Sequence, residues 1–227
     1  YATYQKSMAY GAVGKYEEKF HYLNTIFERF QDSPWSSKAL FEVANTYLIM
    51  DNNEQALRYY QNFIKRYPHS SNVKGALLNM GLVYYNTERS NEALEVFDRL
   101  LTEYPGTSES RDALGTIKSI YIEQDRAEEY FVYIQKTANI SVSSLDKDST
   151  LYLSAENQYH NGDLNRAVSG FEHYLESFPK GLFTIKANYY LADCYRRLDR
   201  KNEALSYYET VANGRRNEYT EKSLSSA

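Results

Sequence analysis

The sequence predicts an all-α solenoid built from antiparallel helix pairs, and a repeating pattern carries that prediction. Three tripeptides recur at one phase, Arg66-Tyr67-Pro68, Glu103-Tyr104-Pro105 and Ser177-Phe178-Pro179. Tyr67 and Tyr104 lie 37 residues apart, and Phe178 follows two further periods on. A fixed period of this size is typical of repeat architectures, in which each unit packs on its neighbours. Residues that recur at the period therefore form the scaffold, and function is sought in what varies.

Each repeat reads as a helical hairpin when position 1 is set at Ser37. Apolar residues at positions 4, 7, 8 and 11 follow helical spacing, and a polar turn separates them from a second stripe at positions 20, 24 and 27. Small residues at 8 and 20 let the two backbones approach, an aromatic at 24 fills the space toward the next repeat, and proline at 32 ends the second helix. Position 8 reads Ala44, Gly81, Ala155 and Ala192, position 20 reads Ala56, Ala93, Ala167 and Ala204, and position 24 reads Tyr60, Phe97, Phe171 and Tyr208.

This phase divides the chain into successive helix pairs. The predicted divisions are a degenerate N-terminal pair at 1–36, repeats at 37–73 and 74–110, a degenerate repeat with a kink at 111–147, repeats at 148–184 and 185–221, and the start of a truncated repeat at 222–227. In the first pair Tyr10 is in phase, whereas Lys6 and Lys19 occupy positions that are normally buried.

The pattern breaks in the repeat at 111–147. Lys118 and Tyr130 replace the two small residues, so either the helices move apart or Ala127 takes the close contact after a shorter turn. Both routes predict a different turn here, and the polar stretch that follows predicts a hinge near 138–148; the alternative is a degenerate repeat that packs normally. Position 11 is a tyrosine in the other repeats, namely Tyr47, Tyr84, Tyr121 and Tyr195. In the repeat at 148–184 Gln158 stands there instead, and a one-residue slip of the first helix would bring Tyr159 into phase.

Composition narrows the function. The 227 residues carry a net charge of -4, which argues against nucleic acid as a partner because such binding favours a basic face. No apolar run approaches the roughly 20 residues that span a bilayer, so direct membrane insertion within this sequence is not expected. The single Cys194 cannot form an internal disulfide, and nothing in the sequence indicates an oligomeric state. The chain starts at Tyr1 and stops in a helical pattern, which predicts a piece of a longer protein.

Motifs for catalysis and cofactor binding are absent from the sequence. There is no phosphate-binding glycine-rich loop, no His-Glu-x-x-His and no Cys-x-x-Cys, and the four histidines share no metal-ligand spacing. The sequence therefore predicts a protein that is not an enzyme and holds no cofactor or metal.

The repeat resembles the tetratricopeptide repeat (TPR) family. The copy with the fullest match reads Leu77, Met80-Gly81, Tyr84, Ala93, Phe97 and Pro105, against the family pattern of small, aromatic and proline positions. The longer period with Tyr-Pro loops is similar to the repeats of bacterial envelope proteins, such as the outer-membrane assembly lipoprotein and the Tol-associated coordinator. The resemblance implies a right-handed superhelical solenoid, and a periplasmic or outer-membrane-associated location rather than a cytoplasmic one.

The resemblance also implies where a partner binds, because the first helix of each hairpin lines the concave face in the family. Carried onto this chain, the partner-binding groove comprises Phe41, Asn45, Leu82, Tyr85, Asn86, Tyr152, Glu156, Tyr159, Tyr189, Asp193, Arg196 and Arg197. Exposed aromatic groups beside a few charges favour a protein or peptide over a small molecule. The alternative for Phe41 is packing between successive first helices. The family's carboxylate clamp is not expected, because Phe41 and Asp112 stand where it needs lysines.

The sequence thus predicts a non-catalytic scaffold that binds a partner protein or peptide on its concave face. One alternative is a structural subunit of a multiprotein bacterial envelope complex that uses the solenoid ends or the convex face. A third class, an enzyme with substrate-binding repeats, requires a catalytic domain outside this sequence. The basic cluster Arg196, Arg197, Arg200 and Lys201 fits either an acidic partner or a solvated helix end that complements the helix dipole.

Overall fold

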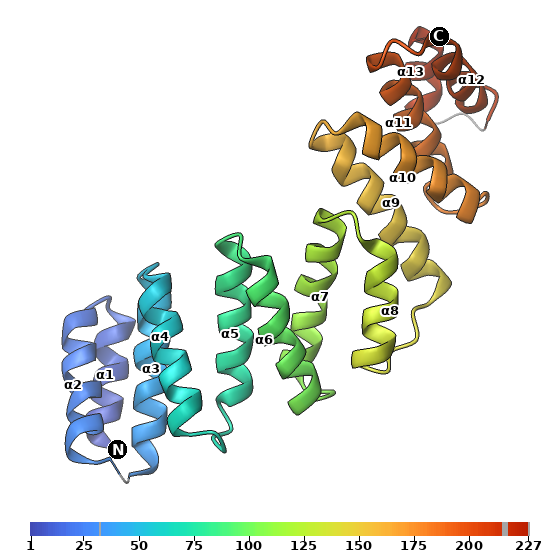
Figure 1. The fold of residues 1–227 in the computed structure, drawn as a ribbon. Helices are drawn as coiled ribbons and strands as arrows, with labels where there is room; N and C mark the ends of the chain where they lie inside the picture. Colours follow the sequence, from blue (N-terminus) through green and yellow to red (C-terminus); the bar gives the residue numbers. More distant parts are fainter. Residues whose placement is uncertain (32, 215–217, 227) are drawn as a thin grey trace. The chain divides into compact units, whose positions relative to one another are not determined.

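The computed structural model describes residues 1–31, 33–214 and 218–226, and across them it shows thirteen helices and no strand (Figure 1). The all-α prediction is confirmed. The chain forms two compact units, Tyr1–Thr116 and Ile117–Ala227, and the division falls inside one helix. The helices are α1 (Ala2–Ala12), α2 (Tyr16–Arg29), α3 (Pro34–Ile49), α4 (Asn53–Arg66), α5 (Val73–Asn86), α6 (Ser90–Glu103), α7 (Ser108–Glu123), α8 (Ala127–Thr137), α9 (Ser144–His160), α10 (Leu164–Ser177), α11 (Thr184–Arg197), α12 (Lys201–Ala212) and α13 (Glu218–Ser226).

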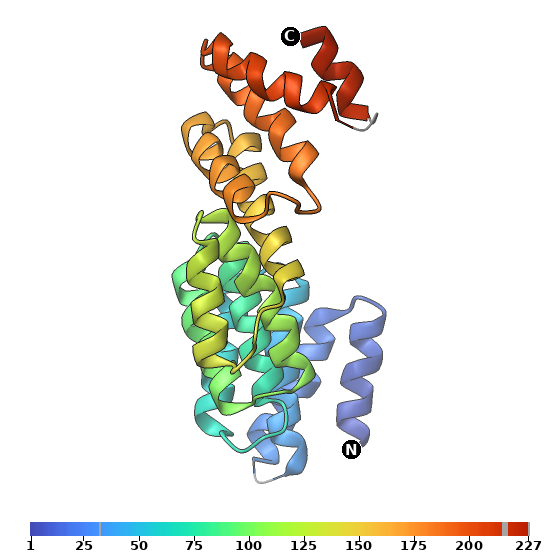
Figure 2. The ribbon, with the colours of Figure 1, turned by 90° about the vertical axis from the view of Figure 1, so that its right-hand side faces the viewer.

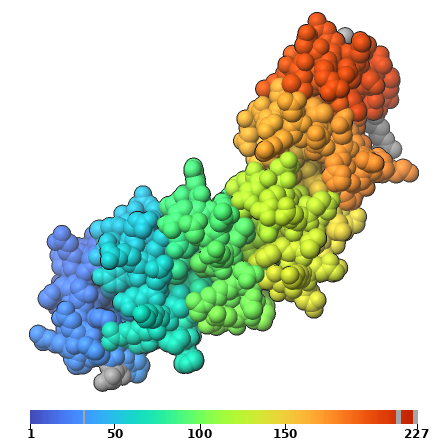
Figure 3. Space-filling model, in the orientation of Figure 1, coloured from blue at the N-terminus to red at the C-terminus, as the bar shows by residue number. Residues whose placement is uncertain are grey.

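The first unit is a stack of antiparallel pairs, α1 with α2, α3 with α4 and α5 with α6, and each pair packs on the next (Figure 1). The space-filling view shows these pairs as adjoining bands in sequence order (Figure 3). Between the first two pairs, Leu23, Ile26, Ala39 and Val43 form a buried core. Burial of this apolar stripe, rather than intrinsic helix propensity, is what stabilises such short helices.

The second unit repeats the arrangement. Helix α9 pairs with α10, α11 pairs with α12, and α13 lies on α11 and α12, as the C-terminal half of Figure 2 shows. Helix α8 packs on α9, and Tyr121 contacts Tyr130 across the α7–α8 pair, with ring centroids 6.0 Å apart. Across the described residues, no helix combines the length and apolarity needed to cross a bilayer.

One turn geometry closes every hairpin. The middle residue of each three-residue turn has a positive φ, and the N–H of the third turn residue donates to the carbonyl of repeat position 11, which is a Schellman ending. The residues at position 11 are Tyr10, Tyr47, Tyr84, Tyr121, Gln158 and Tyr195. This backbone motif fixes the phase between the two helices without help from side chains. The middle residues are Gly14, Asp51, Glu88, Asp125, Gly162 and Asp199, with φ between 55° and 81°.

The predicted change of turn at 111–147 is wrong for this reason, and the one-residue slip that would bring Tyr159 into phase does not occur. The turn at 111–147 does not differ from the others, because Asp125 has φ 58° and the Arg126 N–H donates to the Tyr121 carbonyl at 2.8 Å. The repeat at 148–184 does not slip, because the Asp163 N–H donates to the Gln158 carbonyl at 3.0 Å and Gln158 is buried in phase. The repeat at 111–147 thus keeps the common turn, and it buries Tyr130 at the position where other repeats carry a small residue.

The predicted repeat boundaries and the hinge at 138–148 stay predictions. Each first helix begins shortly before its predicted boundary, for example α9 at Ser144 and α11 at Thr184. Residues 215–217 of the repeat predicted at 185–221, and residue 227 of the last segment, lie outside the described residues.

Gly81 shows how the small residue at position 8 works. A Cβ on Gly81 would lie 2.2 Å from Cε1 of Phe97, whose ring is fully buried and has nowhere to move. The small residue at position 8 therefore lets the Phe97 ring at position 24 on α6 pack directly against the α5 backbone.

Gly81→Ala is expected to lower the free energy of unfolding by up to about 2 kcal/mol, because overpacking costs about 1–3 kcal/mol and the gain in helix propensity returns only roughly 1 kcal/mol. Gly115→Ala is the control, since a Cβ there meets nothing within 4 Å, and it should stabilise by up to about 1 kcal/mol. Urea unfolding measures both, and equal stability of the two variants would contradict the packing argument.

Candidate functional site

The predicted groove residues lie on the first helices of their hairpins, in two separate groups. Helices α3 and α5 of the first unit carry Phe41, Asn45, Leu82, Tyr85 and Asn86, and helices α9 and α11 of the second unit carry Tyr152, Glu156, Tyr159, Tyr189, Asp193, Arg196 and Arg197. Their role in binding a partner stays a prediction, and each group has its own local chemistry.

In the second unit, Glu156 joins α9 to α11. Its Oε1 accepts a hydrogen bond from the Tyr152 hydroxyl at 2.7 Å, and the same oxygen forms an ion pair with Lys186 Nζ at 2.8 Å. The Lys186 ammonium also lies 5.3 Å from the centroid of the Tyr152 ring and 5.7 Å from that of Tyr190. Because both charges are partly shielded from water, this pair is stronger than an exposed surface pair.

About one helical turn further along the same face, Asp193 of α11 connects α11 to α9 in a similar way. Its Oδ2 accepts from the Tyr159 hydroxyl at 2.8 Å, and its Oδ1 accepts from Arg196 Nη2 at 2.6 Å. Two effects raise the pKa of Tyr159: burial, which is the larger, and the hydrogen bond to Asp193. The hydroxyl of Tyr159 therefore stays protonated as a donor. The Arg197 guanidinium lies 5.4 Å from the Tyr159 ring centroid. We call the surface formed by Glu156, Tyr159, Lys186, Tyr189, Tyr190, Asp193, Arg196 and Arg197 the α9–α11 face.

Tyr152 differs from its prediction as an exposed anchor. Its side chain is 1% exposed, and its ring stacks on Phe183 with centroids 4.4 Å apart and planes 10° apart. Tyr174 meets it edge-on at 5.6 Å. Tyr152 is therefore the buried floor of the α9–α11 face, because a loop outside the repeat pattern covers it. Tyr189 stays half-exposed and contacts Tyr190, Tyr208 and Tyr219.

Sequence reasoning left Tyr190 and Tyr219 out of the groove. The pair Tyr189-Tyr190 is the signal that was available, since adjacent aromatics on a helix point to neighbouring surfaces. Tyr219 lies in the short C-terminal helix α13, three residues before the repeat predicted to start at residue 222, at a position outside the apolar pattern of the repeat.

In the first unit, the predicted groove residues Asn45 and Phe41 make contacts within the helix pairs. Asn45 Oδ1 accepts from the Tyr60 hydroxyl at 2.5 Å, Asn79 Nδ2 donates to that hydroxyl at 2.9 Å, and Asn45 Nδ2 donates to Glu42 at 3.1 Å. Phe41 contacts the rings of Tyr60 and Phe63 at 5.9 and 5.4 Å. Leu82 and Tyr85 are half-buried and Asn86 is exposed. Both rings belong to α4, the second helix of the same hairpin, and a Cβ on Gly75 of the next first helix would lie 3.6 Å from Phe41 Cζ, so Phe41 packs within its hairpin and toward α5.

The basic cluster at the end of α11 is largely neutralised by nearby acids. Arg196 pairs with Asp193, Arg200 with Glu203 at 2.9 Å, and Lys201 with Asp199 at 3.6 Å. Local pairing of this kind favours the solvated helix end over a site for an acidic partner.

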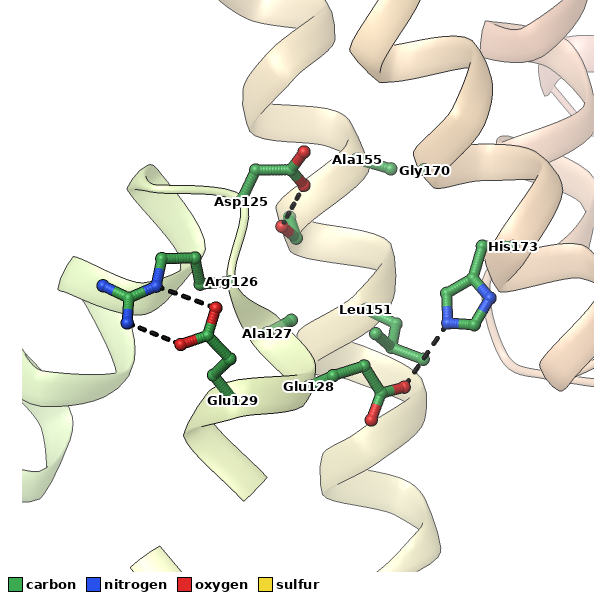
Figure 4. A pocket seen from close by; sticks show the side chains of 10 residues that line it. Asp125, Arg126, Ala127, Glu128, Glu129, Leu151, Ala155, Gly170 and His173 are labelled. Atoms are coloured by element: carbon green, nitrogen blue, oxygen red, sulfur yellow. Dashed lines mark hydrogen bonds and ion pairs between the residues drawn. The ribbon is translucent and has the colours of Figure 1, made fainter. Parts of the chain in front are cut away.

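A cleft of about 180 Å³ lies in the second unit between the α7–α8 turn and helices α9 and α10 (Figure 4). Arg126 faces Glu129, His173 lies 3.4 Å from Glu128, and the Ser154 hydroxyl donates to Asp125 at 3.0 Å. The imidazole and the hydroxyl thus have different partners, and the arrangement does not form a nucleophile with its base. The repeat pattern does not predict this cleft.

Two further features bear on chemistry. Cys194 is fully buried, and burial raises the pKa of its thiol to about 12, so the neutral thiol packs in the core. Within residues 1–31, 33–214 and 218–226, no three histidine, cysteine, aspartate or glutamate side chains are grouped to hold a metal ion.

Among solved structures, a tetratricopeptide repeat protein from Parabacteroides merdae is 17% identical, with a TM-score of 0.53 over 92% of this chain and 77% of that chain. The pilus biogenesis factor PilW is 16% identical over 98% and 97%, with a TM-score of 0.47. YrrB, described as a TPR protein with an unusual peptide-binding site, is 16% identical over 90% and 98%, with a TM-score of 0.44. At these identities the likeness to the first protein shows the fold alone.

Family patterns cover most of the sequence, although no curated protein matches it. The tetratricopeptide repeat pattern matches residues 149–181 and 186–213, which confirms the resemblance seen in the repeats. The pattern of an outer membrane lipoprotein family, YfiO, matches residues 1–136, more than half of the chain. The chain therefore belongs to the outer membrane lipoprotein family YfiO and carries tetratricopeptide repeats in its second unit.

Proposed function

We propose that this protein is a non-catalytic scaffold that binds a partner protein or peptide on the concave face lined by its first helices. The observation that carries the proposal is the α9–α11 face, where half-exposed tyrosines lie beside two exposed arginines, Arg196 held by its ion pair with Asp193 and Arg197 over the Tyr159 ring. Tyrosine and arginine dominate protein-binding hot spots, and side chains already fixed lose less entropy when a partner binds.

The polar links across the face support this role in particular. Glu156 with Lys186 and Tyr159 with Asp193 each connect two hairpins, so the rings between them have fixed positions. In such a face the aromatic rings supply apolar burial, and the charges select the partner. Membership of an outer membrane lipoprotein family supports a location in the bacterial envelope, periplasmic or attached to the outer membrane.

The test is a crosslinked pull-down from the source cells with the full-length protein as bait. Tyr189→Ala/Arg197→Ala alters the α9–α11 face, and we expect it to weaken partner binding about 30-fold, which corresponds to roughly 2 kcal/mol. The matched control is Tyr207→Ala/Arg166→Ala, which removes the same residue types from the second helices α12 and α10 of the same hairpins. Circular dichroism confirms that both variants fold.

The alternative function, a structural subunit that binds through its ends or convex face, has its own supporting observation. Large apolar side chains are exposed at hairpin turns and on second helices, including Val13, Ile49, Val132 and Leu205. Loss of a partner from the α12/α10 variant alone would favour this alternative. An unchanged set of partners in both variants would contradict binding at the α9–α11 face.

A further inference from the structure

A buried carboxylate in the second unit holds the loop between α10 and α11. Asp148, on α9, is 6% exposed. Its Oδ1 accepts from the Tyr174 hydroxyl at 2.6 Å, and its Oδ2 accepts from the Leu182 N–H at 2.9 Å. The Tyr174 oxygen in turn accepts from the Phe183 N–H at 2.9 Å. Two consecutive loop amides are therefore satisfied by one acid and one phenol from other parts of the hairpin.

This pairing is specific to one hairpin of the array. At the position of Asp148 the other repeats carry Ser37, Lys74, Arg111 and Ile185, and at the position of Tyr174 they carry Phe63, Leu100, Thr137 and Val211. The acid and the phenol thus occur together, and only in the repeat at 148–184. Burial, followed by the hydrogen bond to Asp148, raises the pKa of Tyr174, which keeps the phenol protonated as a donor.

The loop backbone fits closely over this pair. A Cβ on Gly181 would lie 2.5 Å from the Tyr174 hydroxyl oxygen and 3.0 Å from Asp148 Oδ1, so only glycine lets the chain pass. The Thr184 hydroxyl donates to the Gly181 carbonyl at 2.9 Å, which closes the loop from its other side. These contacts give the loop a single position relative to α9.

The position of the loop decides the floor of the α9–α11 face. Phe183, whose N–H is bound to Tyr174, places its ring on Tyr152 with centroids 4.4 Å apart. Tyr152 then donates to Glu156, the acid that holds Lys186. A chain of direct contacts therefore runs from the Asp148 carboxylate through the loop and two stacked rings to the ion pair on the surface.

We propose that Asp148 is a positioning residue that fixes the α10–α11 loop, and through Phe183 and Tyr152 the geometry of the Glu156–Lys186 pair on the α9–α11 face. The proposal rests on the proposed function only in treating this face as a binding surface. The arrangement of the rings is testable without any partner.

The experiment compares Asp148→Asn with Asp163→Asn in the full chain by NMR and amide hydrogen exchange. An asparagine amide keeps the shape of Asp148 but accepts at only one of its two atoms, so either the Leu182 N–H or the Tyr174 hydroxyl that receives the Phe183 N–H loses its acceptor. The loop is then held less firmly, and amide exchange at Leu182 and Phe183 should rise at least about tenfold. The Phe183 ring protons should also lose the upfield shift that stacking on Tyr152 gives them. Asp163 caps α10 from a half-exposed position, and asparagine caps equally well, so the control should change neither signal.

Tyr174→Phe is the second variant, which keeps the ring and removes only the hydroxyl. It should free the Phe183 amide while the Leu182 amide stays bound to Asp148, a difference that general destabilisation would not produce. The proposal is overturned if Asp148→Asn folds with the Leu182 amide protected and the Phe183 shift unchanged. It is equally overturned if Tyr174→Phe leaves the Phe183 amide protected. Loss of partner binding in the Tyr189/Arg197 variant is a separate result, so the two proposals fail independently.

Discussion

Tyr152→Ala is expected to lower the free energy of unfolding by about 3–5 kcal/mol, the usual cost of deleting a large buried aromatic side chain. The ring is 1% exposed and contacts Phe183, Tyr174 and Phe171, so its loss leaves a cavity bordered by rings from α10 and the α10–α11 loop. The variant also leaves Glu156 without its hydrogen-bond donor from α9. Urea unfolding, followed by the change in midpoint at constant slope, measures the effect.

Tyr152→Phe is the matched control, because it keeps the ring and removes the hydroxyl. It should lose only about 1 kcal/mol, the contribution of one hydrogen bond, since Lys186 still pairs with Glu156. If Tyr152→Ala unfolded at the same urea concentration as Tyr152→Phe, the ring would not be part of the core. A binding defect in Tyr152→Ala would report on folding, which is why the partner test uses Tyr189 and Arg197.

The exposure of Tyr152 shows where prediction from sequence ends. Position 5 of the repeat holds Phe41, Leu78, Gly115, Tyr152 and Tyr189, and the repeat pattern treats them alike. Only Tyr152 is buried, because Phe183 from a loop outside the pattern covers it. The periodic pattern is sufficient to place a residue on a helix and on a face of that helix. Its exposure depends on loop contacts that have no period.

The phase of the hairpins was more predictable than the details of their turns. Small residues such as Gly81 and aromatics such as Phe97 carry the helix pairing in their sizes, and the structure places them in contact. The changed turn after Tyr121 and the slip at Gln158 do not occur: the first assumes that the bulky Lys118 and Tyr130 alter the register, and the second that the side chain at position 11 sets the register. The backbone of the turn sets it, and aspartate tolerates the required positive φ at Asp125 as it does at Asp51.

Lys19 conflicts with the repeat pattern, and an acid from the next hairpin resolves the conflict. The residue stands where four other second helices carry alanine, and its side chain is only 4% exposed. Its Nζ pairs with Glu42 Oε2 at 3.1 Å, and its stem passes over Gly11, where a Cβ would lie 2.7 Å from Lys19 Cδ. Gly11 on α1 thus leaves space for the stem of Lys19, and Glu42 on α3 supplies the counter-charge for its ammonium group.

Glu42→Ala is expected to destabilise the protein by about 3 kcal/mol, because it leaves the Lys19 ammonium buried without a counter-charge. The estimate takes the lower end of the range for buried pairs, since the Glu42 side chain keeps 16% of its surface exposed. Asn45 also loses the acceptor of its amide at 3.1 Å. Thermal and urea unfolding of the full chain measure the loss.

The decisive comparison is the double variant Lys19→Ala/Glu42→Ala, which removes both charges and introduces the alanine found at this position in four other hairpins. It should be more stable than Glu42→Ala alone, because replacing both members of a buried pair removes the uncompensated charge. Adding Gly11→Ala should then be tolerated, since the lysine stem that fills this space is gone. A double variant that is no more stable than Glu42→Ala would mean that Lys19 contributes through the packing of its stem, and that the charge pair does not hold the first hairpin to the second.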